Sequence, residues 1–206
     1  MSDTISSKVL KAIEKSPNGI IALDMLESLR VADRSTLKTT LSRLNKAGKI
    51  IRLKRGLYSH NPIQDVFATA QATFKGYLGF TSALYLHKLI AEMPFTIVVV
   101  TTHTSKSKTL GIYESKAVAL KEKAIGFERK ENYVISTRAK TLFDCIYLQE
   151  YSIEPNKLVE SFKQAKLSSG EWHEFDLYVK KFAKEKSGKR FYDMKKRIMG
   201  GRTYGT

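Results

Sequence analysis

Polar and basic side chains are frequent between positions 33 and 59, in the segment DRSTLKTTLSRLNKAGKIIRLKRGLYS, where leucines recur at regular spacing. Leu37, Leu41 and Leu44 fall at intervals of four and three, which places them on one face of a predicted helix. Arg, Lys, Ser and Thr side chains occupy most of its remaining surface. Such groups donate hydrogen bonds to phosphate oxygens and to base edges, so the segment is suited to an anionic, hydrogen-bonding partner.

Residues that favour helix ends flank this predicted helix, and a strand–turn–strand pattern follows it. Asp33 or Ser35 is suited to accept from the free N–H groups of the first turn. Gly48 stands where a helix commonly ends on a left-handed residue. Residues 50–54 then alternate in a strand pattern, and residues 54–58 form a basic turn with the start of a return strand.

The residues before position 33 predict further elements of the same domain. The spacing of apolar residues predicts a helix over residues 4–15, a short strand at 20–21 and a second helix over 22–29. Three helices followed by a cationic hairpin are typical of a winged helix-turn-helix, whose third helix enters the DNA major groove while the hairpin lies on the backbone. The residues predicted to contact DNA are Arg34, Ser35, Thr36, Lys38, Thr39, Thr40, Arg43, Lys46, Arg52, Lys54, Arg55 and Tyr58.

A winged helix can also serve as a protein-binding module, and charge favours the nucleic-acid interpretation. Residues 1–60 hold 12 Lys and Arg against 5 Asp and Glu. The whole chain of 206 residues has a formal charge of +16, which favours phosphate-rich partners through counterion release. A basic surface that serves solubility alone is the other interpretation.

Composition and cysteine usage limit the class of protein. With 42% hydrophobic residues, the chain can bury a normal core. The lone Cys145 excludes an intramolecular disulfide and a cysteine-cluster metal site, as expected for the reducing cytoplasm. No apolar run approaches the length of a membrane span, and we expect a cytoplasmic protein without membrane contact.

The residues after Asn61-Pro62 predict a second, mixed α/β domain over positions 61–206, separate from the winged helix of residues 1–60. The overall expectation is an α+β protein with a helical C-terminal end. Helices are predicted at 67–74, 81–90, 137–151, 156–166, 171–182 and 189–198, and strands at 94–102, 116–120, 124–129 and 133–135.

Four segments in order give this chain a family resemblance: LKRGLYSHNP, FTSALYLHKLI, TIVVVTT and TRAKTLFDCIYL. Over roughly Ser7 to Tyr151, the chain resembles AbiEi-type proteins, the antitoxin and repressor components of type IV toxin–antitoxin systems. The resemblance implies a repressor that binds double-stranded DNA at an inverted repeat upstream of its own gene. It also implies an antitoxin that counters a nucleotidyltransferase-like toxin without a stable complex between the two.

Enzyme motifs are largely missing from the sequence. It holds no phosphate-binding P-loop, no HExxH and no GxSxG segment, and we expect neither catalysis nor a cofactor nor a bound metal. The alternative is a nucleic-acid-processing enzyme, in which the winged helix delivers DNA to a nuclease-like second domain. Glu128-Arg129-Lys130 has the E-x-K spacing of such a nuclease, but no aspartate lies between Asp65 and Asp144 to complete a metal site.

Three further basic segments leave alternatives open. The loop expected at residues 103–108 either holds a phosphate or is simply solvated. Arg138 and Lys140 lie in the first turn of a predicted helix, where cations oppose the helix dipole, so anion binding and surface charge are both open. Residues 178–206 carry 10 Lys and Arg against 2 Asp and Glu; their aromatic residues either accompany nucleic acid or pack inward.

Overall fold

The computed structural model describes residues 4–200, apart from the side chains of residues 185–187, and it is an α+β protein with a helical C-terminal end. Its residues divide into two compact units, Met1–Lys75 with Lys108–Glu114, and Gly76–Ser107 with Ser115–Thr206. The main elements of the first unit are α1 (Ile5–Glu14), β1 (Ile20–Ala22), α2 (Leu23–Ser28), α3 (Arg34–Lys46), β2 (Ile50–Lys54), β3 (Leu57–His60) and α4 (Val66–Phe74).

The core of the first unit forms where the apolar stripes of α1, α2 and α3 meet the small sheet. Val9, Leu26 and Leu37 come from the three helices, and all three are fully buried. The sheet is antiparallel with the order β1-β3-β2, so β3 is its central strand. The helices and strands predicted from residues 4–60 are therefore all present, with ends shifted by one or two residues.

The second unit begins with β4 (Tyr77–Leu78), α5 (Phe80–Leu86) and β5 (Thr96–Thr101). Its later elements are β7 (Tyr113–Ala119), which starts in the first unit, β8 (Phe127–Lys130), β9 (Tyr133–Ser136), α6 (Arg138–Tyr147), α7 (Pro155–Ala165), α8 (Ser169–Phe182) and α9 (Glu185–Ile198). Together with β6 (Lys106–Leu110), the strands make a six-stranded mixed sheet of order β6-β7-β5-β4-β9-β8.

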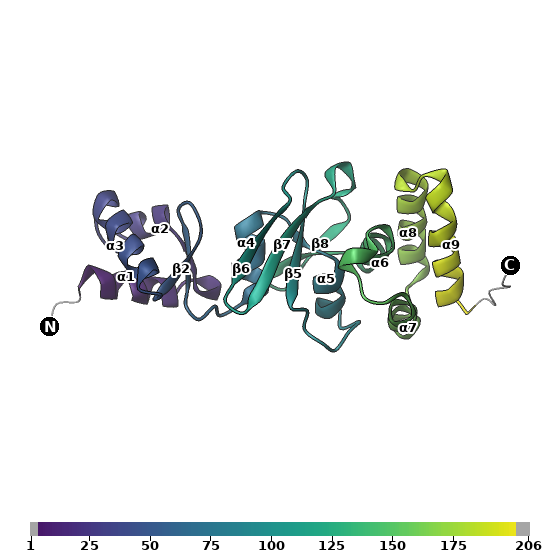
Figure 1. Cartoon of the computed structure of the whole chain (residues 1–206), viewed down its shortest axis with the longest axis horizontal. Coiled ribbons are helices and arrows are strands. Elements are labelled where there is room, and N and C mark those ends of the chain that lie inside the picture. The colour runs from purple at the N-terminus through teal and green to yellow at the C-terminus, as the bar shows by residue number, and fades with distance from the viewer. Residues whose placement is uncertain (1–3, 201–206) are drawn as a thin grey trace. The chain divides into compact units, whose positions relative to one another are not determined.

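Helix α6 is the centre of the second unit's core. Its residues Leu142, Phe143 and Ile146 are buried among side chains of the sheet and of α8 and α9. Phe143 stacks on Phe191 of α9 with ring centroids 5.0 Å apart. Figure 1 shows α7, α8 and α9 gathered beside α6 in this unit.

Some elements of this part of the chain differ from the ranges predicted from sequence. The helix expected over residues 81–90 ends at Leu86, because Lys88 adopts a left-handed conformation (φ 60°) and Leu89 N–H bonds back to Leu84 O. Residues 106–110 form strand β6 instead of continuing the expected loop, and residues 77–78 form the unpredicted strand β4. Both strands lack a run of apolar residues long enough to indicate them from sequence.

The first compact unit reaches Lys75, past the predicted domain boundary between residues 60 and 61, which stays a prediction. Helix α4 groups with the first unit, and so does the β6–β7 turn at residues 108–114. Two lysines hold these segments to β2. Lys54 donates from Nζ to the backbone carbonyls of Ala72 and Thr73 in α4, and Lys108 donates to the carbonyls of Arg52 and Leu53.

Candidate nucleic-acid interface

Helix α3 carries most of the predicted contact residues, and its start is firmly capped. The Asp33 carboxylate accepts from the backbone N–H groups of Ser35 (2.9 Å) and Thr36 (3.0 Å). Its buried face holds Leu37, Leu41 and Leu44, as the spacing predicted, together with Thr40. This face fixes the rotation of the helix, so most of the remaining positions point toward solvent.

A groove lies between α3 and the β2–β3 hairpin of the same unit. Its volume is about 610 Å³. The residues that line it are Leu23, Asp24, Arg34, Lys38, Leu41, Ser42, Asn45, Arg52, Arg55, Gly56 and Tyr58. Four of these side chains are cationic and one is a carboxylate, so the groove favours an anion.

The predicted contact residues divide by exposure. Eight of them are exposed: Arg34, Ser35, Lys38, Thr39, Arg43, Lys46, Arg52 and Arg55. Lys38 lines the groove, while Thr39, Arg43 and Lys46 lie farther round the outer surface of α3. Exposed donors therefore lie both on the outer surface of α3 and on the hairpin of the first unit.

Thr40 and Tyr58 are largely buried, although Tyr58 also borders the groove. Thr40 is 9% exposed because it lies on the leucine side of α3. Tyr58 is 7% exposed because it belongs to the central strand, opposite Ile21 of β1 and Arg52 of β2. Thr36 is half-buried, and its hydroxyl donates to the Asp33 carboxylate at 2.5 Å.

Lys54, a predicted contact residue of the hairpin, already has partners in the first unit. Its amino group turns toward the last turn of α4, where it donates to two backbone carbonyls, at 3.2 Å for Thr73 O. Partial burial, reinforced by the charge of Lys75, lowers the pKa of Lys54. A cation in this position satisfies the free carbonyls at a helix C-terminus, so Lys54 supports the fold.

Arg34 is exposed but already has partners. Its guanidinium lies 2.8 Å from the Asp24 carboxylate and also pairs with Glu27, both on α2. Hydrogen bonds to these two carboxylates raise the pKa of Arg34. Arg34 therefore joins α2 to α3, and its charge is locally balanced.

Ser42 and Asn45 line the groove although they were outside the predicted contact set. They follow Lys38 at i+4 and i+7, which is the spacing that places them on the same side of α3. Asn45 Oδ1 also accepts from the backbone N–H of Arg52 at 2.8 Å. This bond joins β2 to α3 within the lining of the groove.

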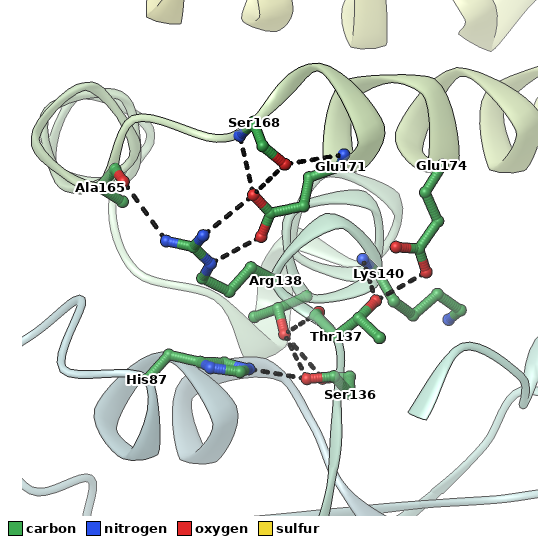
Figure 2. Close-up of polar contacts among 10 residues, drawn as sticks. His87, Ser136, Thr137, Arg138, Lys140, Ala165, Ser168, Glu171 and Glu174 are labelled. Carbon is green, nitrogen blue, oxygen red and sulfur yellow. Dashed lines mark hydrogen bonds and ion pairs between the residues drawn. The ribbon is translucent and has the colours of Figure 1, made fainter. Parts of the chain in front are cut away.

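In the second unit, the two cations at the start of α6 have carboxylate partners. Figure 2 shows the pair that Arg138 forms with Glu171. Arg138 makes two bonds to Glu171, at 2.7 and 2.9 Å, and a third to Ala165 O. Lys140 is fully buried, with Nζ 2.5 Å from Asp144 Oδ1. The structure thus excludes simple surface charge for Lys140 and gives both cations a structural role in place of a free anion site.

The same junction holds a chain of hydrogen bonds between β9, α6 and α8. Thr137 caps α6 by accepting from Lys140 N–H, and its hydroxyl donates to Glu174 Oε1 at 2.8 Å. His87 Nε2 lies 2.7 Å from Ser136 O (Figure 2). Burial lowers the pKa of His87, so the neutral ring donates to this carbonyl.

Within the described residues, the structure adds no metal ligands to the E-x-K segment at residues 128–130, and in the segment at residues 103–108 Thr104 bonds to the nearby Thr101. Glu128 and Lys130 are exposed on β8, and within residues 4–200 no three His, Cys, Asp or Glu side chains cluster as metal ligands would. In the segment after β5, the Thr101 hydroxyl donates to Thr104 O and accepts from Thr104 N–H.

None of the helices in the described range is both long and apolar enough to cross a bilayer.

The aromatic residues of the basic C-terminal segment mostly pack inward. Phe191 is fully buried and Tyr178 is 8% exposed, while Tyr192 is exposed. The inward-packing interpretation is therefore confirmed for most of these rings. Residues 201–206 of this basic segment lie outside the described residues. Among the basic residues, Lys195 pairs with Asp176 at 2.7 Å and Arg197 donates to Asn156.

Comparison with known protein families and with curated proteins adds no assignment to this site. No family model matches the chain, and no curated protein matches it significantly.

Proposed function

We propose that the first unit is a winged helix-turn-helix domain that binds double-stranded DNA. The observation that supports this most strongly is the groove between α3 and the β2–β3 hairpin, with Lys38, Arg52 and Arg55 along it. In this arrangement α3 enters the major groove and the hairpin lies against the neighbouring backbone. Cations at both places position the protein on phosphates.

Within this proposal, the contacts fall into two groups. Ser35, Thr39 and Arg43 are exposed on α3 and are the candidates to meet base edges. Arg52 and Arg55 of the hairpin are candidates for phosphate contacts. Arg34 is assigned instead to holding α2 on α3, because both of its carboxylate partners belong to α2.

The finer biological role is proposed from the resemblance to AbiEi-type proteins. The protein would repress its own operon from an inverted repeat, and it would counter a nucleotidyltransferase-like toxin through the second unit. The well-packed core around α6 supports a second unit with a role of its own, because it is built independently of the first core. An adjacent reading frame of the nucleotidyltransferase type would be the partner gene.

Binding to DNA from upstream of the gene should be strongly salt-dependent. We expect affinity for an inverted repeat in that region to fall by about two decades or more between roughly 50 and 200 mM salt, because several phosphate contacts release counterions. Fluorescence anisotropy with a labelled duplex measures this. A protein-binding winged helix predicts no such affinity, and plasmid cleavage in added Mg²⁺ or Mn²⁺ would favour the nuclease alternative.

Substitutions should separate the two groups of contacts. Arg43→Ala should relax discrimination between operator and scrambled duplex by about 1–3 kcal/mol if its guanidinium reaches a base. Arg55→Ala should weaken binding to both duplexes alike and make the salt dependence shallower. The comparison is the ratio of the two affinities for each variant. An unchanged ratio in Arg43→Ala together with a changed ratio in Arg55→Ala would reverse the proposed placement.

A further inference from the structure

A pocket of about 620 Å³ opens on the second unit, between the segment that joins α5 to β5 and helix α7. Its lining residues are Thr81, Leu89, Ile90, Ala91, Glu92, Met93, Pro94, Phe95, Ile153, Glu154, Lys157, Glu160, Ser161 and Gln164. This volume lies within the range of pockets that hold small molecules, about 300–1,000 Å³. The proposed DNA-binding function makes no use of it.

The wall of the pocket combines buried and exposed apolar groups. Leu89, Ile90 and Ile153 are half-buried and pack against the core of the unit. Met93 and Phe95 remain 37% and 67% exposed. Large apolar side chains left in water beside a concavity mark a surface that gains free energy when a ligand covers it.

The charge of the pocket is opposite to that of the chain. Its lining holds three carboxylates, Glu92, Glu154 and Glu160, and one lysine, Lys157, whereas the chain as a whole has a formal charge of +16. An anion or a nucleic-acid backbone would be repelled by these carboxylates. A cation would be attracted to this pocket but repelled by most of the rest of the surface, which gives the pocket selectivity.

The three carboxylates differ in whether their side chains already have hydrogen-bond or ion-pair partners. Glu154 caps α7 by accepting from the N–H groups of Asn156 (3.1 Å) and Lys157 (3.3 Å). Glu160 pairs with Lys163 at 2.9 Å. Glu92 is exposed, and no hydrogen bond or ion pair engages its side chain within the described residues. Glu92 is therefore the carboxylate best placed to receive a new partner.

We propose that this pocket binds a small hydrophobic cation, an ammonium or guanidinium group carried on an aryl or branched aliphatic body. The cation pairs with Glu92, and the apolar body covers Met93, Phe95 and Ile153. Such a ligand satisfies both halves of the pocket at once, since neither an apolar molecule nor a bare cation uses all of its lining. The site is independent of the proposed DNA interface.

The test uses the full-length protein and three probes of one shape: phenylpropylamine, the neutral phenylpropanol and the anionic phenylpropionate. We expect saturable amide shifts in NMR spectra at residues 89–95 and 153–164 with the amine. Its affinity should exceed that of the alcohol by about tenfold, equivalent to about 1.4 kcal/mol. The propionate should bind more weakly still, because the carboxylates repel it.

Two substitutions complete the experiment. Glu92→Gln should reduce the amine affinity toward that of the alcohol while leaving the alcohol's affinity unchanged. Glu150→Gln removes one exposed carboxylate outside the pocket and should change neither value. Equal affinities for the three probes, shifts centred on other residues, an unchanged amine affinity in Glu92→Gln, or no saturation by about 10 mM amine would each overturn the proposal.

Discussion

Lys140→Met should lower the free energy of unfolding of the second unit by about 3–5 kcal/mol at neutral pH, because it leaves a buried carboxylate without its partner. Lys140 and Asp144 are both fully buried, and Asp144 Oδ2 has no hydrogen-bond partner within the described residues even in the intact pair. The chain's one tryptophan, Trp172, lies in α8 of this unit. Its fluorescence during urea unfolding measures the change.

Two control variants separate the loss of charge pairing from the loss of a lysine. Lys163→Met breaks an exposed pair with Glu160 and should cost less than about 1 kcal/mol. Lys140→Met combined with Asp144→Leu removes both buried charges and should recover most of the loss, since an apolar pair of similar volume fits the same space. If Lys140→Met and Lys163→Met were equally mild, the pair would not be the buried contact described.

The same variant should also become less stable as pH rises. Burial raises the pKa of Asp144 from 3.8 to about 6, although Lys140 opposes this shift. Removing Lys140 removes the opposing effect, so the folded pKa rises further. The unfolded chain then loses the proton first, and the folded state is progressively disfavoured from about pH 4 up to the folded pKa. Urea midpoints for Lys140→Met between pH 4.5 and 7.5 measure this trend.

The first unit was more predictable from sequence than the second because its elements are marked locally. Leucine spacing, the Asp33 cap and Gly48 (φ 66°) together define α3 before any tertiary contact is considered. Strands β4 and β6 carry no comparable signal. Residues 77–78 are too short for a periodic pattern, and residues 106–110 are mostly polar, so sheet pairing determines both.

The exposed positions of the candidate contact surface were predictable from sequence, but the partners of its charged side chains were not. Exposure of Lys38, Thr39 and Arg43 follows from helix periodicity. The partners of Lys54 and Arg34 could not be found this way, since α4 and α2 supply them. A basic residue in a sequence indicates positive charge, but only the fold decides whether that charge is already balanced.

Removing the groove cations should abolish tight DNA binding while sparing the proposed antitoxin role. In the full-length triple variant Lys38→Ala, Arg52→Ala, Arg55→Ala, we expect operator affinity to fall by at least about a hundredfold, because three charged contacts to phosphate are lost. The log–log salt slope should become shallower by about 0.9 for each phosphate contact removed. All three side chains are exposed, so the fold should remain intact, which Trp172 fluorescence can verify for the second unit and circular dichroism for the whole chain.

The matched control is Lys8→Ala, Lys11→Ala, Lys15→Ala, which removes the same charge from exposed positions of α1 and its C-cap, outside the groove. If overall charge alone drives binding, both triple variants should weaken it equally, and the proposed interface would be wrong.

Growth of cells that express the partner toxin tests the proposed antitoxin role. The groove variant should still rescue growth, because its substitutions lie in the first unit and the antitoxin role is assigned to the second. Loss of rescue in this variant, at unchanged protein level, would mean that toxin relief acts through DNA binding and would contradict the assignment of that role to the second unit.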